Sequence, residues 1–86
     1  MNHRALLARL VRGEVRNVRF GDFTGLVRDF GFTFSRQDGS HHIYSHPQVR
    51  ELVNLQEVGG EAKPYQIRQV LRLIERYNLN MREDGA

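Results

Sequence analysis

The sequence GSHHIYSHP, residues 39–47, marks the hairpin around which the fold is expected to form. Asp38 and Gly39 give a turn signal, and Pro47 ends the stretch because proline cannot continue the interior of a strand. Residues 41–46 between these signals predict a strand that pairs with the residues before the turn. The stretch also holds three of the four histidines of the chain, so the hairpin carries side chains that titrate near neutral pH.

The residues before this turn predict a helix followed by a strand. Apolar side chains from Phe20 to Phe30 recur every three or four residues, which is typical of an amphipathic helix. Gly31 suits a left-handed helix cap, with Phe32 placed for the usual hydrophobic contact. From Phe32 to Arg36 the apolar period changes to two, which indicates a half-buried strand.

Beyond Pro47 the chain predicts a third strand and a closing helix. Residues 52–56 alternate, with Val53 and Leu55 facing inward, and the glycines at 59 and 60 are expected to end the strand. Pro64 fits the first position of a helix whose apolar face continues to residue 78. Residues 80–86 are expected to fray.

A further amphipathic helix is predicted near the N-terminus, from Ala5 to about Gly13, followed by a charged connection over residues 14–19. The whole chain, residues 1–86, is therefore expected to form a single α+β domain. The predicted order is helix, helix, three antiparallel strands, helix, in two layers with the helices on one face of the sheet.

Composition limits the class of protein. Hydrophobic residues make up 40% and charged residues 27% of the chain, which is ordinary for a folded domain. There is no cysteine, which excludes disulfides and cysteine-based zinc sites and fits a reducing cytoplasm. The apolar runs are short and interrupted by arginines, so neither a signal peptide nor a membrane span is expected.

The charge of the chain favours a polyanionic partner. The formal net charge is +3, and residues 1–36 hold seven arginines against three acidic residues. Arginine presents a planar donor group suited to phosphate. RNA and an acidic protein fit this signal equally well, and a merely solvated surface is the alternative. The arginines predicted to contact RNA are Arg36 and an i, i+4 stripe on the last helix, Arg68, Arg72 and Arg76.

The histidine cluster does not predict a metal site. Neighbouring strand residues point to opposite faces, so His41 shares a face with Ile43 whereas His42 shares the other with Tyr44 and His46. His42 and His46 lie roughly 13 Å apart along an extended strand, too far for one ion. No cofactor is expected either. Which face is open depends on whether Tyr44 or Ile43 packs in the core. Tyr65, Tyr77 and the phenylalanines are interpreted as packing residues.

Residues 20–79 resemble the HicA toxins of bacterial and archaeal toxin-antitoxin systems. The resemblance rests on Gly31 after a helix, a short strand, the motif GSHHIY at 39–44, the His46-Pro47 pair and Arg68 in the last helix. It implies a fold similar to the double-stranded-RNA-binding domain, an mRNA-cleaving activity that inhibits translation, and a HicB-like antitoxin partner. Residues 1–19 extend beyond the family core. Their role, like self-association of the chain, stays open.

The resemblance also implies that His41, directly after Gly39 and Ser40, is the catalytic residue. Metal-independent RNA cleavage requires a general acid/base near neutral pH, which imidazole supplies. A second group is needed to stabilise the phosphorane or protonate the leaving oxygen; the candidates are Arg68, His42 and Lys63, in that order. The alternative is a non-catalytic RNA- or protein-binding module in which His41 is structural.

Overall fold

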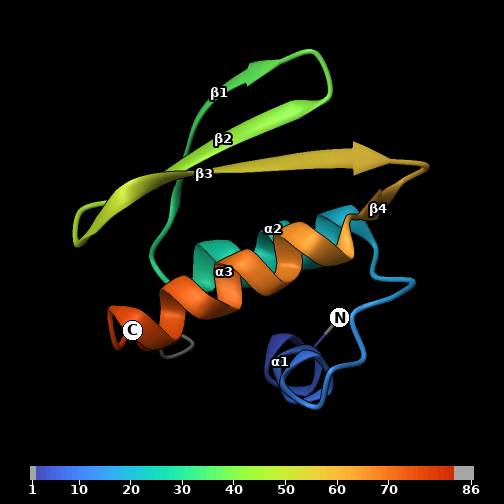
Figure 1. The fold of residues 1–86 in the computed structure, drawn as a ribbon, viewed down its shortest axis with the longest axis horizontal. Helices are drawn as coiled ribbons and strands as arrows, with labels where there is room; N and C mark the ends of the chain where they lie inside the picture. Colours follow the sequence, from blue (N-terminus) through green and yellow to red (C-terminus); the bar gives the residue numbers. More distant parts are fainter. Residues whose placement is uncertain (1, 83–86) are drawn as a thin grey trace.

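Residues 2–82, which the computed structural model describes, form three helices and four antiparallel strands (Figure 1). The strand order is β1-β2-β3-β4, and α2 and α3 lie side by side across one face of the sheet. The predicted α+β fold with helices on one face is confirmed. In chain order the elements are α1 (His3–Val11), α2 (Phe20–Asp29), β1 (Thr33–Asp38), β2 (His41–His46), β3 (Val49–Val58), β4 (Glu61–Ala62) and α3 (Pro64–Arg76).

The fourth strand, β4, is a correction to the three strands predicted. Gly59 and Gly60, which were expected to end the third strand, instead form a hairpin turn that pairs Val58 with Glu61. Their φ angles are 59° and 79°, and a type I′ turn requires positive φ at both central residues, which glycine adopts without strain. The third strand is also longer than predicted at both ends, because Val49 pairs with the end of β2 and residues 57–58 pair with β4.

The C-terminal end of α2 forms the predicted glycine cap. Gly31 has a φ of 96°, and its N–H donates to the carbonyl of Arg28 at 2.9 Å, while the N–H of Phe32 donates to that of Val27 at 3.3 Å. These two bonds are those of a Schellman motif, which satisfies carbonyls left without partners at a helix end. The cap fixes the direction in which the chain enters β1.

The core lies between the sheet and the pair α2 and α3. Tyr44, Val53 and Leu55 face the helices from the sheet, and Phe23 and Ile67 are completely buried on the helical side. Tyr44 on β2 and Val53 on β3 stand opposite each other in the strand register, so one face of the β2-β3 pair supplies the core. The opposite face of the sheet is left open to solvent (Figure 1).

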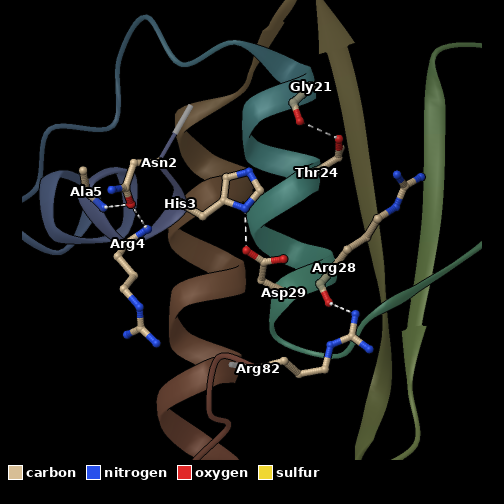
Figure 2. A network of polar contacts seen from close by, with 9 residues as sticks. All are labelled: Asn2, His3, Arg4, Ala5, Gly21, Thr24, Arg28, Asp29 and Arg82. Carbon is tan, nitrogen blue, oxygen red and sulfur yellow. Dashed lines mark hydrogen bonds and ion pairs between the residues drawn. The ribbon is translucent and has the colours of Figure 1, made fainter. Parts of the chain in front are cut away.

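Helix α1, whose role the sequence left open, packs against α2 on the side away from the sheet (Figures 1 and 2). Leu6 and Leu10 are buried, and the His3 ring forms an ion pair with Asp29 on α2, as Figure 2 shows. Asn2 caps the helix by accepting from the backbone N–H of Arg4 at 2.9 Å. Thus α1 thickens the helical layer and leaves the open sheet face uncovered.

The connection between α1 and α2 is more ordered than its charged sequence suggests. Val15 and Val18 are buried, and the N–H of Ala62 on β4 donates to the carbonyl of Val18 at 2.9 Å. The N–H of Phe20 donates in turn to the carbonyl of Gly60 at 2.9 Å. These bonds join the connection to the β4 hairpin.

At the other end of the chain, Leu79 is buried and Arg82 contacts the end of α2. The backbone N–H of Arg82 donates to the carbonyl of Asp29 at 2.7 Å, and its guanidinium donates to that of Arg28 at 3.1 Å (Figure 2). Residues 83–86 of the tail that was expected to fray lie outside the described residues. No helix within residues 2–82 is long and apolar enough to cross a membrane.

Candidate functional site

The motif residues Gly39 and Ser40 form the two-residue turn between β1 and β2. Asp38 pairs with His41 across this turn, and Gly39 has a φ of 64°. A positive φ at the first central residue is typical of a type II′ turn, for which glycine is preferred. The carbonyl of Ser40 accepts from the N–H of Glu57 on β3 at 3.2 Å, so the turn is held on both sides and His41 begins β2 at a fixed position.

His41 lies on the open face of the sheet. Tyr44 is only 2% exposed and belongs to the main core, so the alternation along β2 directs the His41 side chain away from the helices. His41 stands opposite Gln56 in the register, and Ile43 stands opposite Asn54. The imidazole is therefore carried by the sheet and remains partly exposed.

The Nδ1 atom of His41 is hydrogen-bonded to the Oδ1 atom of Asn54 at 2.9 Å. A carbonyl oxygen only accepts, so Nδ1 carries the proton and Nε2 of the neutral ring keeps its lone pair. An imidazole oriented in this way can accept a proton at Nε2. Asn54 was not singled out from the sequence, although it alternates with the inward residues Val53 and Leu55 and so shares the open face with His41.

Lys63 is linked to the turn that carries His41. Its Nζ atom donates to Oε1 of Gln56 at 3.4 Å, and Nε2 of Gln56 donates to the hydroxyl of Ser40 at 3.4 Å. The backbone N–H of Gln56 donates to Oε1 of Gln66 on α3 at 2.7 Å. The start of α3 is thereby attached to the edge of the sheet, and the lysine charge lies on the His41 side of the hairpin.

A hollow of about 320 Å³ opens between β3 and the start of α3. One of its walls is Asn54, the residue that holds His41. Tyr65, which was interpreted from the sequence as a packing residue, is instead 57% exposed. The complete lining is Asn54, Lys63, Tyr65, Gln66 and Gln69.

His42 lies on the opposite face from His41 and contacts aromatic rings. Its ring centroid lies 4.7 Å from that of Phe20 and 6.3 Å from that of Phe34. His42 thus covers the edge of the core, and the structure does not bring it together with His41.

His46 is fully engaged with the backbone. Its Nε2 is bonded to the carbonyl of Phe30 at 3.0 Å, while the N–H of Gln48 donates to Nδ1 at 3.0 Å. Because a carbonyl accepts and an N–H donates, the ring is neutral with its proton on Nε2. The ring also packs on Phe32 with a centroid distance of 5.0 Å. His46 is therefore a structural histidine.

The arginines predicted to bind RNA lie on separate surfaces. Arg36 stands opposite Ile43 in the register and thus on the open face with His41. Arg68 lines a different hollow together with Arg16. Arg72 and Arg76 line a groove between β3 and α3. The stripe on α3 is therefore divided, and Arg36 is the member of the set that shares a face with His41.

A β-bulge explains the orientation of Arg36. Phe34 stands opposite Tyr44, but Arg36 stands opposite Ile43, so the register shifts by one residue between them. Without this shift, simple alternation would put Arg36 on the same side as Phe34. The bulge redirects the second half of β1 toward the open face.

Glu51, near the start of β3, lines the groove between β3 and α3. It accepts from the hydroxyl of Tyr77 at 2.6 Å and from the guanidinium of Arg76 at 2.9 Å. The hydrogen bond from Tyr77, with smaller contributions from its own backbone N–H and from Arg76, lowers the pKa of Glu51 below its ordinary value, against a partial desolvation that raises it. Arg76 is therefore occupied by an acidic partner.

Within residues 2–82 no three histidine or acidic side chains converge on a point where a metal ion could bind. His41 and Asn54 lie on the open face, and the hollow beside Asn54 is lined by amides, a lysine and a tyrosine. Such a set can move a proton and bind a phosphate without a metal.

Comparison with known proteins gives one finding. A family model described as "HicA toxin of bacterial toxin-antitoxin" matches residues 22–75. This range includes most of α2, all four strands and most of α3, and it omits α1. No curated protein and no solved structure gives a significant match.

Proposed function

This chain belongs to the HicA toxin family of bacterial toxin-antitoxin systems, and we propose that it acts as an endoribonuclease that cleaves mRNA without a metal ion and so inhibits translation. His41 is its general acid/base. The observation that carries the proposal is the bond between His41 and Asn54. It orients the ring so that Nε2 of the neutral form can accept a proton on the open face of the sheet, where an RNA strand can approach.

The reaction begins when Nε2 of His41 removes the proton from a ribose 2′-hydroxyl. The 2′ oxygen then attacks the adjacent phosphorus, and the bond from phosphorus to the 5′ oxygen of the next nucleotide breaks. The products are a 2′,3′-cyclic phosphate and a 5′-hydroxyl, whose oxygen receives a proton from the second group or from water. Asn54 keeps the imidazole in the required tautomer throughout.

Lys63 is the favoured second group. It bonds to Gln56, which stands opposite His41 in the strand register, and its positive charge stabilises a phosphorane on this side of the sheet. Arg68 lines a different hollow and His42 lies on the opposite face. Lys63, the last of the three candidates in the sequence analysis, is therefore placed first.

The partners follow from the family and from the charge. A toxin-antitoxin family implies an antitoxin, and we assign this role to a HicB-like protein. The RNA target is mRNA, which places the activity in the cytoplasm. Arg36 contributes to RNA binding from the face that carries His41, whereas Arg68, Arg72 and Arg76 bind RNA further from the reaction or face the antitoxin. Binding through these cations weakens as salt increases.

The test is cleavage of purified single-stranded RNA in the presence of EDTA. His41→Ala is expected to slow cleavage by about 10²–10⁴-fold, the usual contribution of one general acid/base, and to abolish toxicity on expression. Cleavage by the variant at the rate of the original chain would contradict the proposal and favour the non-catalytic binding module. A 2′,3′-cyclic phosphate on the 5′ fragment and a free 5′-hydroxyl on the 3′ fragment identify the chemistry.

A further inference from the structure

The hollow beside Asn54 contains an aromatic ring that the packing of the protein does not use. Tyr65, in the first turn of α3, is 57% exposed. Tyr44 is buried in the core, and the hydroxyl of Tyr77 donates to Glu51. Among residues 2–82, Tyr65 makes no hydrogen bond or ring contact. An exposed tyrosine whose ring has no structural task is the type of side chain on which nucleobases stack.

We propose that this hollow binds the nucleotide next to the cleaved bond, with its base stacked on Tyr65 and its phosphate attracted by Lys63. The position next to the cleaved bond rests on the ribonuclease activity proposed above. Asn54 connects the two sites because it lines the hollow and also bonds to His41. A volume of about 320 Å³ is at the lower end of the range for small-molecule sites.

The two glutamines of the hollow have different tasks. Oε1 of Gln66 accepts a hydrogen bond from the backbone N–H of Gln56 at 2.7 Å. The orientation of the Gln66 amide is therefore fixed by the fold. Gln69 makes no such bond with another described residue. A side-chain amide carries both donors and an acceptor, so Gln69 is placed to hydrogen-bond to the edge of the stacked base.

The chemistry of the hollow favours a nucleotide over a peptide strand. Its lining consists of amides, one cation and one aromatic ring, without an acidic or aliphatic side chain. A peptide that extends the sheet needs the backbone groups of the β3 edge, but the N–H of Gln56 on this edge is already bonded to Gln66. The lysine and the aromatic ring together match a phosphate and a base.

The experiment measures RNA binding in the full chain with His41→Ala, so that the probe is not cut. The probe is a short fluorescein-labelled single-stranded RNA, followed by fluorescence anisotropy. Adding Tyr65→Ala is expected to weaken binding roughly tenfold, the loss of one stacked base. Tyr65→Phe keeps the ring and is expected to bind within about twofold of the parent. Val11→Ala, a change at a 70% exposed residue on α1, is the matched surface control.

The outcomes separate this inference from the ribonuclease proposal. Equal affinity of Tyr65→Ala and Tyr65→Phe for the RNA overturns the inference even if the original chain cleaves RNA. Weaker binding of the antitoxin without weaker binding of RNA also overturns it, because the hollow is then a protein interface. If the original chain fails to cleave RNA but binds it with the expected dependence on Tyr65, the ribonuclease proposal falls and nucleotide binding in the hollow stands.

Discussion

The two ends of the β2-β3 hairpin use histidine in opposite ways. At one end, Nδ1 of His41 donates to the Asn54 side chain and Nε2 is left available. At the other end, both ring nitrogens of His46 are bonded to backbone groups. The residues lie on one six-residue strand. Their chemistry differs because the surroundings of His46 occupy both nitrogens and those of His41 occupy one.

The contrast extends to the neighbours of each histidine. Next to His41, Asn54 and Lys63 line an open hollow. At the His46 end, Glu51 near the start of β3 is hydrogen-bonded to both Tyr77 and Arg76. The His41 end therefore presents polar groups to a ligand, whereas the His46 end uses them to join the sheet to α3. The first end should control activity and the second stability.

The largest expected effect is a double dissociation between the two histidines. His41→Ala should lower the RNA cleavage rate about 10²–10⁴-fold and leave the free energy of unfolding nearly unchanged, because the side chain is partly exposed. His46→Ala should cost about 2 kcal/mol of stability, since it removes two hydrogen bonds and a ring contact. Cleavage assays and urea unfolding measure the two quantities.

This comparison would be wrong if the effects were exchanged. A folded His46→Ala variant whose rate per folded molecule falls as far as that of His41→Ala would make His46 part of the reaction. Cleavage rates are measured at urea concentrations below the unfolding midpoint and divided by the fraction of folded protein. Loss of folded protein is then not mistaken for loss of catalysis.

The next effect concerns the residue that orients His41. Asn54→Ala should lower kcat roughly tenfold, the value of about one hydrogen bond. Asn54→Asp keeps an oxygen that accepts from Nδ1 and should cleave faster than the alanine variant. Equal rates for the two variants would show that Asn54 does not position the imidazole. A change confined to KM would assign Asn54 to the hollow instead.

Much of the fold could be predicted from local patterns in the sequence. The helix from Phe20, the Gly31 cap and the strand 41–46 follow from periodicity and glycine chemistry, and the structure confirms them. The β4 hairpin was missed because Gly59 and Gly60 were interpreted as a strand end. Two adjacent glycines are also a signal for a type I′ turn, so the information was present in the sequence.

The site was less predictable because it depends on register. Alternation separates His41 from His42, but the pairing of β2 with β3 decides that Asn54 is the residue bonded to His41. The bulge that turns Arg36 to the open face leaves no signal in a pattern of alternating residues. The contact of Lys63 with Gln56 depends on how α3 returns to the sheet. These relations join distant residues, and local propensity does not encode them.

A smaller effect tests the turn that presents His41. Gly39→Ala should lower stability by about 1 kcal/mol, because Gly39 has a φ of 64° and alanine is strained in that region. No neighbouring atom lies within 4 Å of the added Cβ, so the cost is conformational. Gly21→Ala is the control: it is helical, equally open, and should be neutral or stabilising. Similar losses at both glycines would contradict the role of φ. Thermal unfolding measures the difference.

The smallest expected effect is a pH dependence at the His46 end of the hairpin. Because the Tyr77 hydroxyl holds the pKa of Glu51 below its ordinary value of 4.5, the ionised carboxylate stabilises the folded state. This contribution is complete above the ordinary pKa and is lost as the pH falls through the lower folded value. Tyr77→Phe should therefore be less stable than the original chain at neutral pH and nearly equal to it in acid, measured by urea unfolding.

Tyr65→Phe is the control, because it removes a hydroxyl that has no partner among residues 2–82. Any loss of stability in this variant should be the same at both pH values. If Tyr77→Phe is as much less stable than the original chain in acid as at neutral pH, the bond from Tyr77 to Glu51 does not depend on the carboxylate charge. The electrostatic explanation of the His46 end would then fail.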